Sequence, residues 1–300
     1  MSVWMGLIAA ALGAGVPGEA GYEPEAISAD PFRPPLDPGA LLATELPEVT
    51  ERLVARADMW QAHNLLIWTD ADTGEQRDVI GDTLTVHLGA ARGNGRWRLG
   101  VGVPLHLLLS SDAFDAPAFV AGDLAVSGKL RPRQGPAALT LGLSIPLEGV
   151  SHQLGAQTPA LDVGAVVGRQ GERLALGANA GLRLQDPVTI DNANGSFELG
   201  SQAWYRLGGG YTVAGDWDLT AELMGAVAAD SVSGQPLELL VGTRSEADGR
   251  LVRAGLGVGL RAGIGAPTWR LLVGIGRDPG PLPTVDAIAL PGDLLDDAAR

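Results

Sequence analysis

The sequence predicts an all-β protein, folded as a closed antiparallel barrel of about twelve strands whose apolar face points outward into a membrane. Three observations support this fold class. Apolar side chains recur at every second position through residues 53–276, glycine and charged residues fill the positions between them, and the connectors alternate between short and long. In lipid, only helices and closed barrels satisfy every backbone hydrogen-bonding group. Because this region shows no long helical pattern, we expect the barrel.

The alternation is clear at residues 97–107, where Trp97, Leu99 and Val101 are interleaved with Arg98 and Gly100. A strict period of two indicates strands with one apolar and one polar face. In a soluble sandwich the apolar face would point into the core. Here 46% of the residues are apolar, and the intervening positions are rich in glycine and charge. We therefore expect the apolar face to contact lipid.

Turn signals divide the region into twelve expected strands, an even number, as in bacterial outer-membrane barrels. The strands are expected at residues 53–68, 78–92, 96–110, 121–132, 137–148, 158–169, 172–185, 197–213, 216–229, 236–246, 250–263 and 267–276. Tight connectors with the glycine and asparagine that hairpin turns need lie at 92–95, 132–136, 170–171, 214–215 and 247–249. Longer connectors lie at 69–77, 111–120, 149–157, 186–196 and 230–235, and the last one, at 265–267, is short. This alternation predicts tight turns on the periplasmic side and long loops outside the cell.

The segments that flank the barrel at residues 53–276 differ from it in composition. Residues 1–20 resemble an export signal, since an apolar run is followed by Gly18 and Ala20 at the positions expected before a cleavage site. Residues 21–52 carry seven acidic residues and two arginines, and residues 277–300 carry five and two. We expect these two acidic, proline-containing segments to be tails exposed to the periplasm.

Bulk composition excludes several classes of site and partner. The chain has no cysteine, so it forms neither disulfides nor thiolate metal sites. Its formal charge of −14 argues against nucleic-acid binding, which needs clustered positive charge. The histidines are scattered, and pairing about the Asn94–Gly95 turn places His87 opposite Gly102 and not opposite His106. We therefore expect no metal site and no cofactor.

The polar faces of the expected strands carry charges of both signs. Such charges belong in a lumen, where they pair or meet water, because an arginine facing lipid at the midplane costs about 2–4 kcal/mol. The candidate lumen-facing residues are Asp123, Lys129, Arg131, Asp162, Arg183, Glu198, Arg206, Glu222, Glu238, Arg253, Arg261 and Arg270. Two interpretations stay open: a static network that plugs and braces the barrel, or a wet pore whose charges set selectivity. Twelve strands permit a narrow channel without requiring one.

Aromatic residues are expected near both ends of the strands, where they would form the girdles typical of a membrane barrel. The candidate girdle residues are Trp68, Trp97, Tyr211, Trp217 and Trp269. Of these, Trp97, Tyr211 and Trp217 adjoin tight turns, so we expect them at the periplasmic interface.

Catalysis is not expected. A lipase barrel needs a serine with a neighbouring histidine, and Ser127, Ser144 and Ser201 have none within the expected reach. No G-x-S-x-G nucleophile motif occurs. The acidic turn at residues 70–74 has neither the glycine spacing nor the bidentate glutamate of a calcium loop, so we expect a solvated loop.

Several short motifs are similar to those of a known family. These are residues 30–35 with 41–49, the hairpin at 83–103, Gly122-Asp123-Leu124, and the run from Gly265 to Arg270. Over about residues 30–276 the chain resembles the barrel region of OmpA-family outer-membrane proteins of the myxobacterial type. In that family a peptidoglycan-binding domain commonly follows the barrel. Only 24 residues follow Gly276, so no cell-wall anchor domain is expected in this chain.

Together these observations predict an outer-membrane protein of a Gram-negative bacterium, with membrane lipid as its partner. The function we expect is a narrow passive channel for small hydrophilic solutes. The first alternative is a plugged structural barrel whose external loops are used for binding. The second is a soluble β-barrel or sandwich that binds a ligand.

Overall fold

The computed structural model describes residues 32–277, apart from residues 38, 70–72, 74–75, 113–115, 133–134, 148–153, 155–157, 193–194 and 229–233. Twelve strands form the wall: Leu53–Thr69 (β1), Gln76–Gly93 (β2), Trp97–Leu108 (β3), Leu124–Leu130 (β5), Ala137–Ile145 (β6), Ala160–Gln170 (β7), Leu174–Gln185 (β8), Gln202–Ala214 (β11), Trp217–Ala228 (β12), Gly234–Ala247 (β13), Arg250–Gly263 (β14) and Trp269–Arg277 (β15). Three short strands lie outside this set: Ala118–Ala121 (β4), Val188–Asn192 (β9) and Gly195–Leu199 (β10). The residues described contain no helix long and apolar enough to cross a membrane.

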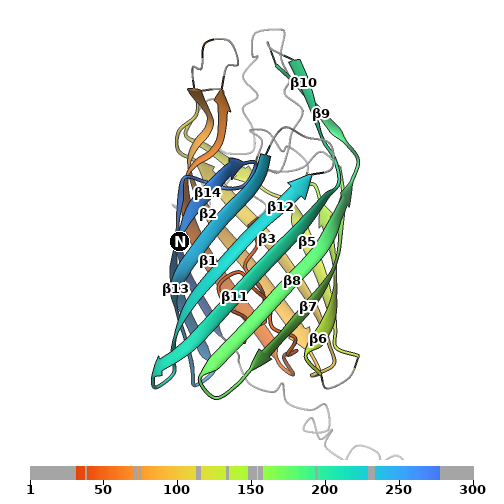
Figure 1. Cartoon of the computed structure of the whole chain (residues 1–300), viewed down its shortest axis with the longest axis vertical. Helices are drawn as coiled ribbons and strands as arrows, with labels where there is room; N and C mark the ends of the chain where they lie inside the picture. The colour runs from red at the N-terminus through yellow and green to blue at the C-terminus, as the bar shows by residue number, and fades with distance from the viewer. Residues whose placement is uncertain are drawn as a thin grey trace, which may run out of the picture.

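The wall is a closed antiparallel barrel (Figure 1). Each strand pairs with its neighbours in sequence, and β1 closes the ring because it pairs with both β2 and β15. Trp60, for example, lies opposite Thr85 on one side and Leu272 on the other. The predicted fold class, a twelve-stranded antiparallel barrel, is therefore confirmed.

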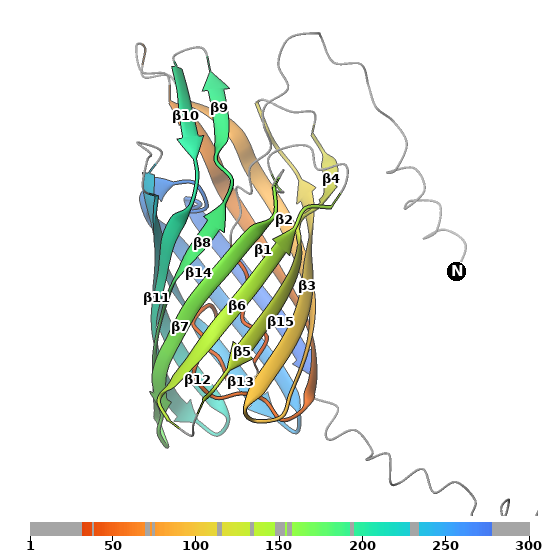
Figure 2. The same ribbon diagram turned by 90° about the vertical axis from the view of Figure 1, so that its right-hand side faces the viewer.

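Tight turns gather at one end of the barrel, which we term the short-turn end; the opposite end is the loop end. Gly95, Gly215 and Gly249 lie in tight turns with φ of 80°, 55° and 69°. This left-handed backbone conformation favours glycine, as the turn prediction required. Figures 1 and 2 show the β9–β10 hairpin projecting beyond the barrel at the loop end.

Side chains alternate between the outer and inner faces of the wall as predicted. In β3, Leu99 is 60% exposed whereas the adjacent Arg98 is 2% exposed. Leu141 and Leu176, in β6 and β8, are also more than half exposed. The outside of the barrel is therefore a broad apolar surface, and the inside carries the polar and charged residues.

Two details of the strand prediction are wrong. The segment expected as one strand at residues 197–213 is divided between β10, which pairs only with β9, and the wall strand β11. In the β2–β3 hairpin, His87 lies opposite Pro104 and not opposite Gly102. The register differs by two residues because the ladder ends at the Gly93–Arg98 pair, which leaves a longer connector than the one assumed.

The larger correction concerns the residues that precede β1. Residues 32–51, which we term the lumen segment, do not form an exposed tail. They run inside the barrel, where they form the coiled red and orange trace behind the wall strands (Figures 1 and 2). Leu41, Leu42 and Ala43 are completely buried there. The expected signal at residues 1–20 and the tail at 278–300 lie outside the described residues.

Candidate functional site in the barrel lumen

The lumen segment has neither helical nor strand structure, so its backbone groups need other hydrogen-bonding partners. Glu222 of β12 supplies acceptors for three consecutive amides. The backbone N–H of Leu42 donates to its Oε1 (2.6 Å), and those of Ala43 and Thr44 donate to its Oε2 (2.9 and 2.6 Å). One buried carboxylate therefore fixes the middle of the segment against the wall.

Cationic side chains of the wall bind the carbonyl oxygens of the same segment. Arg244 donates to the carbonyl of Ala40 (2.6 Å), Arg253 to that of Leu42 (3.0 Å) and Arg206 to that of Ala43 (2.7 Å). Lys129 donates to the carbonyl of Glu48 (2.9 Å), and Arg56 to that of Pro35. The wall side chains thus replace the hydrogen bonds that secondary structure would otherwise supply.

Two acidic residues of the lumen segment pair with buried cations on neighbouring wall strands. Asp37 Oδ2 lies 2.8 Å from both Arg98 Nη1 and Lys129 Nζ. Glu45 Oε1 lies 3.3 Å from Arg98 Nη2, and its Oε2 lies 3.2 Å from Lys129 Nζ. Burial of Glu45 favours the neutral carboxyl, but the charges of Arg98 and Lys129 outweigh burial and lower its pKa to about 2.

The glycines of the inner face receive the leucines of the lumen segment. Each glycine pair lies where an added Cβ would come within 3.0 Å of a leucine methyl group. These contacts join Leu36 to Gly89 and Gly100, Leu41 to Gly208 and Gly210, and Leu42 to Gly242 and Gly255. The absence of side chains at these positions makes room for the segment, which gives a structural reason for the glycine-rich inner face.

Charge pairs also join wall strands to one another. Asp58 of β1 is 2.6 Å from Arg253 Nη2 of β14, and Glu238 of β13 is 3.1 Å from Arg270 Nε of β15. All four side chains are at most 2% exposed. Such pairs are stable only when each charge keeps its partner, because an isolated buried charge is very costly.

Toward the loop end, an apolar cluster fills the β1–β3 side of the lumen. Phe32, Trp60, Ile80, Leu108 and Leu154 are all buried in it. The Phe32 and Trp60 rings meet edge to face with centroids 5.1 Å apart. Leu154 comes from the connector between β6 and β7, so a connector at the loop end also contributes to the closure of the lumen.

Beside this cluster the lumen contains a cavity of about 240 Å³, lined by wall residues from β2 round to β13. The lumen segment bounds it through Phe32–Leu36 and Glu45, and the β14–β15 connector contributes Ile264–Ala266. Charged wall residues, including Asp162, Arg183 and Arg206, also line it. The cavity therefore extends from the lumen segment toward the loop end.

Most of the predicted lumen residues lie inside the barrel. Seven are buried: Asp123, Lys129, Arg183, Glu222, Glu238, Arg253 and Arg270. Asp162 and Arg206 are partly buried and line the cavity. Asp123 is paired with Arg33 of the lumen segment at 3.4 Å.

Of the other three, Arg261 and Glu198 lie outside the lumen, so those two predictions are wrong, and Arg131 is partly buried at the short-turn end. Arg131 follows the end of β5, and its guanidinium donates to the carbonyl of Gly135 within the short turn. Arg261 is exposed near the loop end and donates to Gln235 Oε1 (2.7 Å), because the ladder is irregular there. Glu198 belongs to β10, outside the barrel sheet, and its side chain lies outside the described residues.

Sequence reasoning missed the whole lumen segment, the wall residues Arg56 and Asn179 that bind it, and Asp58, which pairs with Arg253. Arg98 was placed on the polar face but was not among the candidate lumen residues. The strand periodicity already contained the signal for the wall residues, since they alternate with apolar positions. The signal for the segment was its set of leucines among acids. In an exposed acidic tail these leucines would have no apolar surface to pack against.

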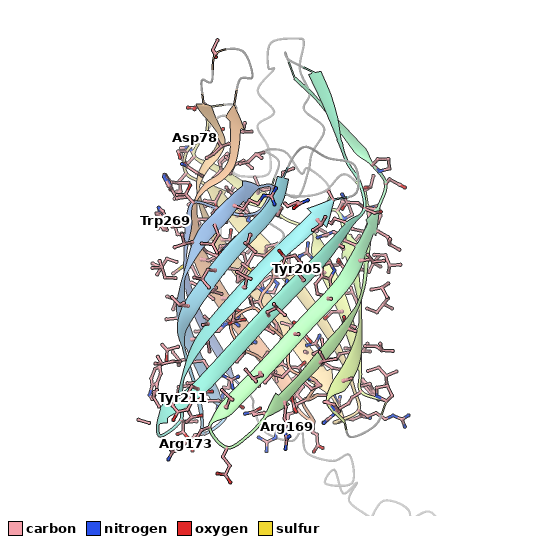
Figure 3. The ribbon with its side chains drawn as sticks, in the orientation of Figure 1. Asp78, Arg169, Arg173, Tyr205, Tyr211 and Trp269 are labelled. Carbon is pink, nitrogen blue, oxygen red and sulfur yellow. The ribbon has the colours of Figure 1, made fainter. Side chains whose placement is uncertain are left out.

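The predicted girdle residues differ in how far the structure describes them. Trp97, Tyr211 and Trp217 are between 41% and 48% exposed. Figure 3 shows Tyr211 near the short-turn end and Trp269 nearer the loop end. The Trp269 ring stacks on His63 with centroids 5.6 Å apart. The side chain of Trp68 lies outside the described residues, and a girdle role for all five remains a prediction.

His63 Nδ1 and Asp82 Oδ1 are 2.9 Å apart. Within the described part of the chain, no three histidine, aspartate or glutamate side chains are grouped so that they could hold a metal ion.

The sequence matches no protein-family profile and no curated protein. Among solved structures, the chain is similar to an outer-membrane channel from Pseudomonas putida F1, with a TM-score of 0.60, 14% identity, and coverage of 81% of this chain and 99% of that one. The translocator domain of the autotransporter NalP from Neisseria meningitidis gives 0.49 and 15%, covering 76% and 89%. A FadL homologue from Pseudomonas aeruginosa gives 0.42 and 10%, covering 85% and 99%. The likeness shows the fold, that of an outer-membrane β-barrel; membership of the OmpA family remains a prediction.

Proposed function

We propose that this chain is a channel for small hydrophilic solutes in the outer membrane of a Gram-negative bacterium, and that residues 32–51 close it from within. The proposed role is transport, and we propose no catalytic activity. The apolar outer surface supports a position in lipid. The observation that carries the proposal is the inner surface behind the lumen segment, which is rich in charged residues and glycines.

The way the segment is held supports its displacement. It contributes no strand to the barrel sheet, so it can leave without breaking a wall ladder. If it left, Glu222, Arg206 and Arg244 would face water in a polar lumen. Charged side chains around such a passage act on the ions that cross it.

The plugged structural barrel remains the second candidate, and one observation favours it. The segment is bound by buried ion pairs from Asp37 and Glu45 and by leucines seated on glycines. A segment held this way can also serve as a permanent core of the barrel.

An engineered disulfide between the lumen segment and the wall distinguishes the gated channel from the permanently plugged barrel. Thr44 Oγ1 lies 2.7 Å from the position of a Cβ on Gly208, so two cysteine Cβ atoms would come within the roughly 4 Å that a disulfide spans. The chain has no cysteine of its own. We expect the Thr44→Cys/Gly208→Cys variant to stay closed in planar-bilayer recordings when oxidised and to open when reduced.

The parent protein and the single variant Thr44→Cys serve as controls, since neither can form the internal bridge. Both should conduct equally with and without reductant. A reduced double variant and a parent protein that never conduct, at any applied voltage, would exclude the channel and support the permanent plug. Equal conduction in the oxidised and reduced states would show that the segment does not block the path.

A further inference from the structure

We infer that the cavity between the lumen segment and the loop end is a binding site for a small organic carboxylate. The proposal rests on the proposed function in one respect, because an anion held there stands where a solute would enter the closed channel. Binding itself does not require conduction, so the two can be tested separately.

The site is formed by three neighbouring strands. On the inner face, Arg183 of β8 lies opposite Gln202 of β11, and two residues further along Gly181 lies opposite Trp204. A Cβ on Gly181 would come within 2.5 Å of the Trp204 ring, and one on Gly164 of β7 within 2.8 Å. The indole of Trp204 therefore packs directly against the backbone of Gly164 and Gly181.

Two guanidinium groups flank this indole along the strands, and neither is paired with a carboxylate. Arg183 Nη2 donates to Ser144 Oγ (3.1 Å), whereas its Nε is buried without a partner. Arg206 donates to the carbonyls of Ala43 (2.7 Å) and Arg33 (3.4 Å). Its guanidinium carbon lies 5.8 Å from the centre of the Trp204 ring. Buried charges are normally paired, so these two cations favour an anion.

The other charged residues of the cavity do not neutralise them. Arg98 and Glu45 are paired with each other, Glu238 with Arg270, and Arg33 with Asp123. The exception is Asp162, which lies opposite Arg183 in the β7–β8 ladder. No ion pair joins these two residues, although both are described. Among the residues that line the cavity, these two arginines therefore face one carboxylate that has no ion-pair partner of its own. Glu45 and Glu222 also act on Arg206 electrostatically, but neither forms an ion pair with it.

The size and the remaining lining indicate a small organic anion. A volume of about 240 Å³ is below the roughly 300–1,000 Å³ of pockets for drug-sized ligands. Pro35, Leu36, Val166 and Met224 add apolar surface to the lining. A carboxylate at the arginines with a compact apolar body against these residues fits both properties.

Isothermal titration calorimetry on the full chain in detergent, at pH 7, tests the inference. The probes are sodium benzoate and benzyl alcohol, which share the ring and differ in charge. We expect benzoate to bind at least tenfold more tightly, as charge-assisted hydrogen bonds imply. Equal affinities would overturn the proposal without any variant.

Two substitutions locate the site by opposite effects. Arg183→Gln should weaken benzoate binding by roughly tenfold. Asp162→Asn removes the opposing charge and should tighten binding by roughly threefold or more, a gain that a misfolded protein would not give. The exposed Arg261→Gln is the matched control and should leave the affinity unchanged.

An Arg183→Gln protein that binds benzoate as the parent does, or an Asp162→Asn protein that binds it no more tightly, would overturn the assignment. A parent that binds benzoate but never conducts would overturn the channel and leave the site intact. A parent that conducts and shows no preference for benzoate would overturn the site alone.

Discussion

The two halves of the lumen use the same kinds of residue with opposite results. In the half near the short-turn end, arginines meet carboxylates and backbone carbonyls of the lumen segment, and glycines receive its leucines. In the half toward the loop end a cavity remains, and two of the arginines that line it, Arg183 and Arg206, form no ion pair with a carboxylate. The first half is filled by the lumen segment, whereas the second keeps an open cavity lined by two arginines without an ion-pair partner.

This difference separates residues that stabilise from residues that are available to bind. A buried charge with a partner contributes to the closed state, and its removal strands the partner. A buried charge without a partner costs free energy in the absence of a ligand. The same substitution, arginine to glutamine, should therefore have opposite consequences in the two halves.

The largest expected effect is the difference in stability between two single variants, Arg253→Gln and Arg183→Gln. Arg253→Gln removes the cation 2.6 Å from Asp58 and leaves that buried carboxylate only the more distant Arg56, at 3.9 Å, so it should lower the free energy of unfolding by up to about 3–5 kcal/mol. Arg183→Gln removes an unpaired charge and one hydrogen bond, so the change should stay within about 1 kcal/mol. Urea unfolding in lipid vesicles measures both. If the two variants lost equal stability, the contrast between the halves would fail.

Low pH should destabilise the protein through Glu45, which lies in the filled half of the lumen. The pKa of Glu45 is lowered to about 2, so its contribution to stability is complete above an ordinary carboxyl pKa of about 4.5 and is lost as pH falls toward 2. A pKa unit is worth about 1.4 kcal/mol, which puts the loss at up to roughly 3 kcal/mol. Unfolding midpoints at pH 7, 5 and 3 should fall mainly below pH 5.

Glu45→Gln is the control for this pH response. Its stability at pH 7 should already be lower than that of the parent, and its further loss between pH 5 and 3 should be smaller. A variant that follows the parent at every pH would assign the acid sensitivity to other carboxylates.

The wall could be predicted from sequence because its rule is local. A period of two decides which face each residue takes, and glycine turns divide the strands, so residues such as Leu141 and Glu222 were placed correctly without any tertiary information. Arg261 was misplaced because an irregularity in the β13–β14 ladder changes the local pairing. Periodicity alone does not reveal such an irregularity.

The lumen segment could not be predicted in the same way, because nothing local determines its conformation. Its backbone is held by side chains such as Glu222 and Arg244, which lie more than a hundred and fifty residues away. Its composition, acidic and proline-containing, is also typical of an exposed tail. Only the presence of Leu41, Leu42 and Leu46, all buried, distinguishes it from such a tail.

The smallest expected effect tests whether the lumen segment rests against the glycines of β11 when the protein is in a membrane. Gly208 and Gly209 are adjacent in β11 but face opposite sides. A Cβ on Gly208 would lie 2.7 Å from Thr44 Oγ1 and 2.8 Å from a Leu41 methyl, whereas one on Gly209 would come no nearer than 3.4 Å to any atom, the nearest being a Leu176 methyl. Gly208→Ala should therefore cost about 1–3 kcal/mol through overpacking.

Gly209→Ala changes the same strand by the same atom, and its outward contact is ordinary, so its stability should match or slightly exceed that of the parent. Comparing the two removes the general effect of alanine on strand formation. In planar bilayers, Gly208→Ala should also open more often than Gly209→Ala, because the added methyl pushes against the segment and not against the wall. Equal stability and equal opening would mean that Leu41 and Thr44 do not rest on β11 in the membrane, and the filled half would then be open as well.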